Sequence, residues 1–173
     1  KYLQGQHILI LGLGSSGLAM TRWCVAMGAE VTLADTREAP PHLSALQAEL
    51  PQVAFKSGAF LANLIEGTTV RAVFASPGLA PTETAPVIDA AKSLGLWVGG
   101  ELSLFVQGLE NLKATRDYSP HVLAITGTNG KTTVTSLTGQ LIERAGKTVK
   151  VAGNIGPTLL DTLRLSMDTE LPE

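Results

Sequence analysis

The sequence predicts an α/β fold, in which a parallel sheet with flanking helices is followed by the beginning of a second α/β unit. Within the first hundred residues, short aliphatic or β-branched runs alternate with turns and helix-period segments, which is the pattern of parallel strands covered by helices. Charged residues make up 16% of the 173 residues, a low share that favours a well-buried chain over a disordered tail. After a polar stretch that ends at Pro120, the alternation begins again.

The elements of the first unit follow from this alternation. Five strands are expected, at His7 to Leu11, Glu30 to Ala34, Val53 to Lys56, Val70 to Ala75 and Leu96 to Val98. Helices are expected between them, at Ser16 to Met27, His42 to Glu49 and Pro86 to Leu94. Gly28 and Gly95 directly follow the first and the last of these helices, where a left-handed glycine ends a helix at little steric cost.

The composition changes at Glu101, so we predict one domain over residues 1–100 and a linker with the first part of another domain over residues 101–173. The second unit is expected to contain a short helix from Glu101, a strand from His121 to Thr126, a helix from Lys131 to Ala145 and a strand from Thr148 to Ala152. One strand, helix and strand cannot bury their own apolar faces. This domain is therefore either truncated or completed from elsewhere.

The composition also excludes several classes of partner. Lys and Arg total 13 against 15 Asp and Glu, a net charge of −2, without the basic stripe that nucleic-acid binding requires. No apolar run approaches the roughly 20 residues of a membrane span. Lys1 and the apolar run ILILGLG resemble a secretory signal, but the glycines of this run are better explained by the glycine-rich loop described below. Cys24, the single cysteine, lies in an apolar helical stretch and is expected to be a buried thiol in a reducing compartment. We expect a cytoplasmic monomer that binds neither nucleic acid nor a membrane.

A glycine-rich loop, Gly12-Leu13-Gly14-Ser15-Ser16-Gly17, separates the first strand from the first helix, and Asp35 follows at the end of the next strand, 18 residues after Gly17. This arrangement matches the fingerprint of Rossmann-like dinucleotide-binding domains. Gly12 permits the tight turn, Gly14 lets the backbone approach a diphosphate, and Gly17 allows close packing of helix and strand. The alternative is a tight turn whose glycines serve packing alone.

Further polar residues are expected at the same carboxyl edge of the sheet, where ligands of open α/β sheets bind. Asp35 suits a ribose hydroxyl of NAD or a polar ring or sugar of a different nucleotide, while Thr36 and Arg37 add a hydroxyl and a fork of donors for phosphate or carboxylate. Ser76-Pro77-Gly78 follows the fourth strand. In the competing interpretation, Arg37 is a solvated surface charge and the Ser76 turn has no ligand.

The strongest signal is AITGTNGKTTV, between a strand and a helix of the second unit. Backbone N–H groups from Thr128 to Thr132 can surround phosphates, Lys131 can neutralise the β and γ oxygens of ATP, and the Thr132 hydroxyl can bind Mg²⁺. A standard P-loop would have its first glycine at Ile125, whereas this loop has Gly127. The spacing therefore disfavours a generic kinase or GTPase.

Taken together, the motifs resemble those of a known family. The loop TGTNGKTT resembles that of the Mur ligases and the folylpolyglutamate synthases, which use ATP to join a carboxylate to an amine. The ordered set GLGSSG, ADTR, ASPG, TGTNGKTT and GNIG resembles the Mur ligases, and among them the branch of peptidoglycan precursor synthesis that adds D-glutamate to UDP-N-acetylmuramoyl-L-alanine. By itself the last motif, Gly153-Asn154-Ile155-Gly156, is equally well a plain turn.

The resemblance implies roles for two groups of residues. The UDP-sugar would be bound by Gly14, Ser15, Ser16, Asp35, Thr36, Arg37, Ser76, Pro77, Gly78 and Asn154. ATP would be bound by Gly127, Thr128, Asn129, Gly130, Lys131, Thr132 and Thr133. Lys131 would be catalytic, stabilising the transferring phosphoryl group, and Thr132 would bind Mg²⁺. An acyl phosphate would form on the alanyl carboxylate, and the amine of D-glutamate would attack it.

The family's remaining catalytic and amino-acid-binding residues would lie beyond Glu173, so residues 1–173 alone are expected to be inactive. Three alternatives stay open. A nicotinamide-dependent oxidoreductase would use the first loop and Asp35, but it leaves the second loop unexplained. A non-enzymatic nucleotide-binding module needs no further residues. A folylpolyglutamate synthase lacks a comparable Rossmann-like domain before its ATP loop.

Overall fold

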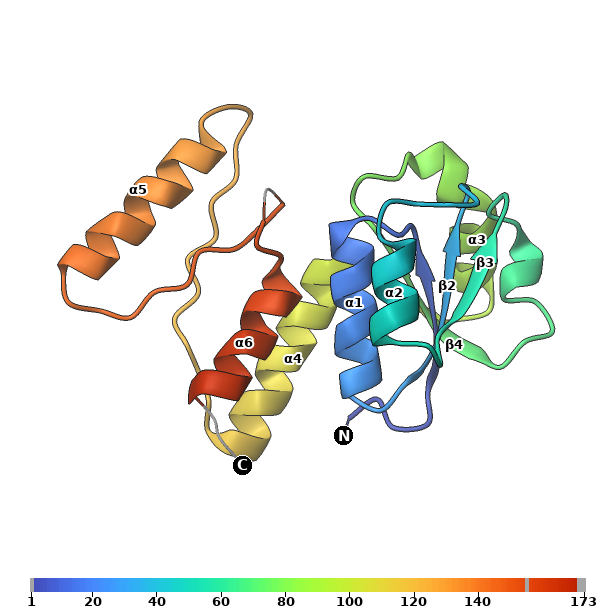
Figure 1. Ribbon diagram of the computed structural model, residues 1–173, viewed down its shortest axis with the longest axis horizontal. Helices are drawn as coiled ribbons and strands as arrows, with labels where there is room; N and C mark the ends of the chain where they lie inside the picture. The colour runs from blue at the N-terminus through green and yellow to red at the C-terminus, as the bar shows by residue number, and fades with distance from the viewer. Residues whose placement is uncertain (1, 155, 171–173) are drawn as a thin grey trace.

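A computed structural model describes residues 2–154 and 156–170. The described residues form a five-stranded parallel sheet in the order β3-β2-β1-β4-β5 (Figure 1). Its strands are β1 (His7–Leu11), β2 (Glu30–Asp35), β3 (Ala54–Ser57), β4 (Val70–Ala75) and β5 (Trp97–Gly99). The chain runs outward from β1 to β3 and then returns to β4 on the other side of β1. This reversal places the expected ligand-binding crevice at the carboxyl ends of β1 and β4, and the predicted Rossmann-like fold is confirmed.

Helices cover both faces of the sheet, as Figure 1 shows. Helix α1 (Ser15–Ala26) and helix α2 (Leu43–Glu49) cover one face, while α3 (Pro81–Ser93) and the 3-10 turn η1 (Ala62–Leu64) cover the other. Because side chains alternate along a strand, β1 sends Ile8 and Ile10 into the first core and Leu9 and Leu11 into the second. The unbroken apolar run of β1 is thus explained by burial on both faces.

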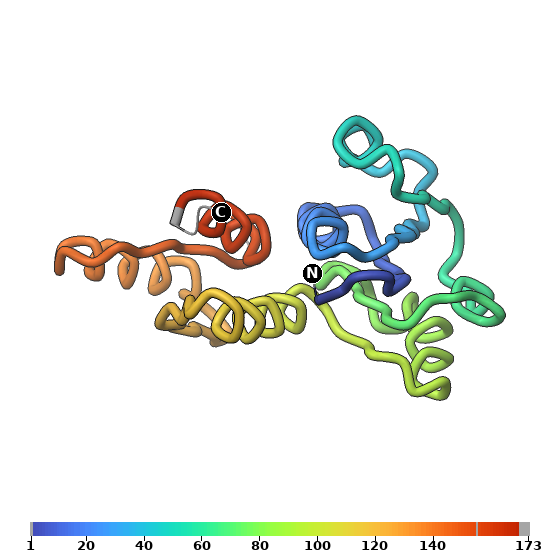
Figure 2. Tube along the Cα trace, turned by 90° about the horizontal axis from the view of Figure 1, so that it is seen from below, coloured from blue at the N-terminus to red at the C-terminus, as the bar shows by residue number. Residues whose placement is uncertain are grey.

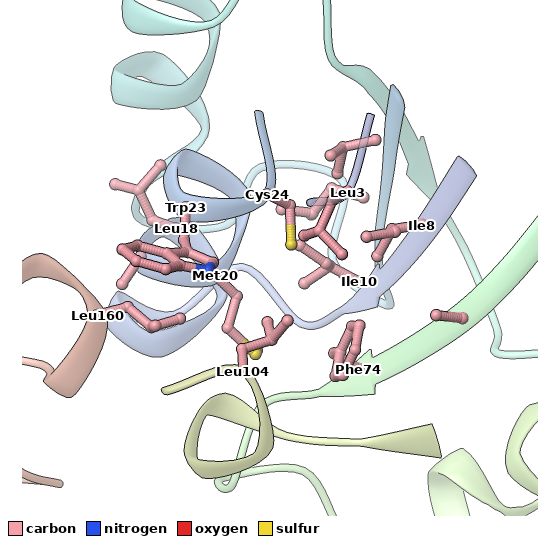
Figure 3. Packing of buried hydrophobic residues seen from close by; sticks show 14 of the residues in the cluster. Leu3, Ile8, Ile10, Leu18, Met20, Trp23, Cys24, Phe74, Leu104 and Leu160 are labelled. Atoms are coloured by element: carbon pink, nitrogen blue, oxygen red, sulfur yellow. The ribbon is translucent and has the colours of Figure 1, made fainter. Parts of the chain in front are cut away.

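Two helices of the second unit extend the first core. Helix α4 (Glu101–Arg116) and helix α6 (Leu159–Glu170) both pack against α1. Their side chains Leu104 and Leu160 lie beside Trp23 and Met20 of α1 (Figure 3). Gly108 makes this approach possible, since a Cβ there would lie 2.6 Å from the indole of Trp23. The second unit is therefore anchored to the first through α4 and α6.

Helix α5 (Lys131–Arg144) lies away from both cores (Figure 2). The strands predicted at residues 121–126 and 148–152 are wrong for this structure, because neither segment is in a strand and both are largely exposed. A strand needs a neighbour to satisfy its backbone N–H and C=O groups. The sheet of the described residues ends at β3 and β5 and offers these segments no partner.

Several helix bounds also differ from the prediction. Helix α3 begins at Pro81 rather than Pro86, because proline is well suited to the first helical position. Helix α4 is not short: it spans 16 residues, since Leu104, Gly108 and Leu112 recur on one buried face. Helix α6 was not expected, although Leu160 and Leu163 lie on its buried side. None of the helices in the described part of the chain is long and apolar enough to span a bilayer.

Candidate functional site

Two glycines of the first loop, Gly12 and Gly17, have a steric role, and Gly14 leaves open space. Gly12 has a φ of +87°, and its N–H donates to the carbonyl of Ala34 at 2.7 Å. A Cβ on Gly17 would lie 1.8 Å from the carbonyl oxygen of Gly12, so only glycine fits beneath this turn. Gly14 is the N-cap residue of α1 and, having no side chain, leaves the N–H groups of the first turn uncapped. Nothing lies within 4 Å of where its Cβ would be. The first turn of α1 therefore presents open backbone N–H donors.

Asp35 is a buried carboxylate whose oxygens are already occupied. Its Oδ2 accepts from the N–H of Leu13 at 2.6 Å and from Nη2 of Arg37 at 2.8 Å. Its Oδ1 accepts from the backbone N–H of Arg37 at 2.9 Å and from Nε at 2.8 Å. Burial alone would raise the pKa of Asp35, but these hydrogen bonds and the charge of Arg37 lower that pKa to about 2. Asp35 thus joins the loop after β1 to Arg37 as a permanent anion.

Ser76 ties the end of β4 to the same loop. Its hydroxyl donates to the carbonyl of Gly12 at 2.9 Å, and its backbone N–H donates to the carbonyl of Leu11 at 2.9 Å. The three strand ends of β1, β2 and β4 are thereby held as one rim. Arg37, half exposed above this rim, has one face on Asp35 and leaves the rest of its guanidinium accessible.

An open cavity of about 390 Å³ lies on this rim. All ten residues predicted to hold a UDP-sugar line it: Gly14, Ser15, Ser16, Asp35, Thr36, Arg37, Ser76, Pro77, Gly78 and Asn154. Sequence reasoning did not assign Leu79 and Glu83 to the site, although both line the cavity. Leu79 directly follows the Ser76 turn, and Glu83 lies in the first turn of α3. Their closeness in sequence to that turn could have predicted that they line the cavity.

The second loop does not reach this cavity. Gly127 and Gly130 have φ values of +150° and +73°, and Lys131 Nζ donates to the carbonyls of Gly127 at 2.5 Å and Thr128 at 3.3 Å. The side chain of Lys131 therefore folds over its own loop. The first backbone bond of α5 runs from Val134 N–H to Gly130 O, which leaves the N–H groups of the first turn without an intrahelical acceptor.

This donor set fits a phosphate and its metal. Residues 127–133 supply backbone N–H groups, one ammonium group at Lys131 and the exposed hydroxyls of Thr132 and Thr133. Among the described residues, no three His, Cys, Asp or Glu side chains are close enough together to hold a metal ion. A magnesium ion here would take the Thr132 hydroxyl together with oxygens of the nucleotide.

Asn154 belongs to a compact turn between α5 and α6. The N–H of Gly153 donates to the carbonyl of Pro157 at 2.9 Å, and the N–H of Gly156 donates to the carbonyl of Gly153 at 3.0 Å. The turn carries Asn154 to the rim of the cavity. Ile155, within the same predicted motif, lies outside the described residues.

Comparison with known families identifies this arrangement. A model of the N-terminal domain of MurD-like Mur ligases matches residues 6–100, which is more than half of the chain. A model of the Mur ligase middle domain matches residues 125–171. The chain belongs to the Mur ligase family.

Two relatives by sequence and one solved structure are similar to this Mur ligase chain. A UDP-N-acetylmuramoylalanine–D-glutamate ligase of Albidiferax ferrireducens is 68% identical over 161 residues, covering 93% of this chain and 32% of that protein. A ligase of the same name from Polaromonas sp. is 44% identical over an alignment of 260 residues, covering 100% of this chain and 44% of that protein. A solved structure, the UDP-N-acetylmuramate:L-alanyl-gamma-D-glutamyl-meso-diaminopimelate ligase from Neisseria meningitides, is similar with a TM-score of 0.48 and 23% identity over 82% of this chain and 40% of that one. The chain spans less than half of the length of these relatives.

Proposed function

We propose that this chain carries the UDP-sugar site and the first part of the ATP site of a ligase that adds D-glutamate to UDP-N-acetylmuramoyl-L-alanine. The observation that carries the proposal is the cavity at the ends of β1, β2 and β4, lined by all ten residues that the family resemblance implied. The names of the relatives at 68% and 44% identity support the same substrate.

The cavity suits a nucleoside diphosphate. The open N–H groups at the start of α1 face anionic oxygens, as helix N-termini do in other phosphate sites. Arg37 adds a positive charge at the rim, held in place by the buried Asp35. Asn154 and the Ser76 turn also line the cavity. The diphosphate therefore lies over Gly14, and the sugar extends toward Asn154.

The occupancy of Asp35 argues against a nicotinamide cofactor. In dinucleotide-binding domains, the acid at this position accepts hydrogen bonds from ribose hydroxyls. Here both carboxylate oxygens already accept from Leu13 and Arg37. Binding NAD through Asp35 would break these bonds, so a UDP-sugar that uses Arg37 itself is favoured.

The second loop binds ATP with Mg²⁺ in this proposal. The N–H groups at the start of α5 and the Lys131 ammonium hold the phosphates, which requires Lys131 to release Gly127 and Thr128. Lys131 then stabilises the phosphoryl group as it moves to the alanyl carboxylate, and Thr132 binds the metal. Bound Mg²⁺ supplies the remaining charge neutralisation.

The wider context follows from the same assignment. We place the first domain at residues 1–100 and the beginning of the ATP-binding domain at residues 101–173. The enzyme acts on soluble nucleotide precursors, so we propose a cytoplasmic monomer with no nucleic-acid or membrane partner. Turnover needs residues that the longer relatives contain outside the matched region.

Calorimetric titration of the chain tests the proposal. We expect UDP-N-acetylmuramoyl-L-alanine to bind and NAD to show no binding. Arg37→Ala should weaken the UDP-sugar at least tenfold, because charge-assisted hydrogen bonds contribute about 1.5–3 kcal/mol. Arg71→Ala is the matched control, since Arg71 is exposed near the start of β4, at the opposite end of the strand from the cavity. Tight binding of NAD with no binding of the UDP-sugar would overturn the assignment.

A further inference from the structure

Glu101 is a buried carboxylate that the proposed reaction does not use. Only 8% of its surface is exposed. Its Oε2 accepts a hydrogen bond from the hydroxyl of Ser16 at 2.9 Å, and its Oε1 accepts from the backbone N–H of Leu160 at 3.1 Å. A buried carboxylate is costly to desolvate, so its position between these two groups calls for a role.

Three helices begin at this carboxylate. Glu101 is the first residue of α4, Ser16 is the second residue of α1, and Leu160 is the second residue of α6. The N-terminus of a helix carries a partial positive charge that favours a nearby anion. The single negative charge of Glu101 is thus stabilised by α1, α4 and α6 together, and it joins the first domain to the second.

Both hydrogen-bonding partners of Glu101 lead to the UDP-sugar cavity. Ser16 lines that cavity directly. Leu160 follows the turn that carries Asn154, and the turn is closed by the bond from Gly153 N–H to Pro157 O at 2.9 Å. Because this turn is compact, the start of α6 fixes where Asn154 lies against the cavity.

We propose that Glu101 is a positioning residue, which holds both Ser16 and the Asn154 turn in place at the UDP-sugar site by bridging α1 and α6. The inference rests on the proposed function of that cavity. Glu101 itself does not line the cavity and makes no contact with the ligand. The Ser16 hydroxyl is engaged by Glu101, and the backbone N–H of Ser16, in the first turn of α1, stays available to the site.

Two substitutions, Glu101→Gln and Glu101→Asp, distinguish the hydrogen bonds of Glu101 to both partners from its negative charge. Glu101→Gln removes the charge but keeps the length: its amide oxygen can accept from Leu160 N–H and its NH₂ can donate to Ser16 Oγ. Glu101→Asp keeps the charge but is one methylene shorter, so it cannot span both partners. Glu101→Ala removes both properties. Glu110→Gln is the control, because Glu110 is an exposed acid on the same helix.

Calorimetry with UDP-N-acetylmuramoyl-L-alanine on the 173-residue chain is the test. We expect Glu101→Ala and Glu101→Asp to weaken binding about tenfold, and Glu101→Gln and Glu110→Gln to stay within about twofold of the unsubstituted chain. In the Asn154→Ala background, Glu101→Ala should cost less than threefold, because one of the two residues that Glu101 positions is gone. This non-additivity distinguishes positioning from a general loss of stability.

Three other results would contradict the inference. Wild-type affinity in Glu101→Asp with a tenfold loss in Glu101→Gln would show that charge matters and the bridge does not. Additive losses of affinity in the double variant would show that Glu101 and Asn154 act independently. If Glu101→Ala does not fold, the Asp and Gln variants decide by the same criteria. Absence of binding by the unsubstituted chain would overturn the proposed function itself, whereas binding that Glu101→Ala and Glu101→Asp leave unchanged would overturn this inference alone.

Discussion

Replacement of Gly17 by Ala tests whether close backbone packing holds the loop after β1. A Cβ on Gly17 would lie 1.8 Å from the carbonyl oxygen of Gly12. The turn would have to open by about 1.2 Å for that distance to reach 3.0 Å, and overpacking of this kind costs on the order of 3 kcal/mol. Alanine recovers at most about 1 kcal/mol through its higher helix propensity. The steric term is the larger of the two.

We therefore expect Gly17→Ala to lower the free energy of unfolding by about 2 kcal/mol, which lowers Tm by about 4–8 °C for a chain of this size. Gly14→Ala is the matched control. Its φ is −92°, which alanine adopts without strain, and nothing lies within 4 Å of the new Cβ. We expect its Tm to stay within about 2 °C of the unsubstituted chain.

Thermal unfolding followed by circular dichroism measures both variants. A titration with UDP-N-acetylmuramoyl-L-alanine then adds a second contrast, since the methyl group of Gly14→Ala enters the cavity and should weaken binding without loss of stability. Equal melting temperatures for Gly17→Ala and Gly14→Ala would refute the packing argument.

Four further predictions follow from the contacts. The pKa of Asp35 is lowered from 3.8 to about 2, so its charge contributes stability that is complete above about pH 4 and is lost as the pH falls toward 2. In urea unfolding, the free energy of unfolding of Asp35→Asn should therefore fall less steeply between about pH 4 and pH 2 than that of the unsubstituted chain. An equal fall in both would contradict this prediction. Amides in residues 121–126 and 148–152 should exchange with deuterium far faster than those of β1, because no strand pairs with them; equal protection would show a sheet there. Lys131→Ala should weaken ATP binding at least tenfold in calorimetry, whereas Lys147→Ala, beyond the C-terminal end of α5, should not, and equal effects would remove the special role of Lys131. Residues 1–173 with both substrates, ATP and Mg²⁺ should release no phosphate in a coupled assay; steady release would show that they suffice.

The first domain could be predicted from the sequence because its signals are local. The bounds of β1 and β4 are those expected, since an apolar run between turns defines a buried parallel strand. Of the predicted cavity residues, all but Asn154 meet for a topological reason: they lie in segments that follow the neighbouring parallel strands β1, β2 and β4, and these segments share one edge of the sheet. No contact had to be known in advance.

The remaining features depend on tertiary contacts. Residues 121–126 have the composition of a strand, but a strand forms only beside another strand, and the sequence does not say whether one is present. The saturation of Asp35 by Leu13 and Arg37 depends on side-chain geometry rather than spacing. The bridge from Glu101 to Ser16 and Leu160 joins three distant segments that no local pattern connects.

Nuclear magnetic resonance mapping of the ligand site tests the central claim most directly. In a titration of the ¹⁵N-labelled chain with UDP-N-acetylmuramoyl-L-alanine, we expect the largest amide shifts around the cavity on the rim of the sheet, at residues 14–16 and 36–37 and at Ser76, Gly78 and Asn154. Little change is expected at residues 127–133 until ATP is added. Shifts confined to residues outside this cavity would contradict the account.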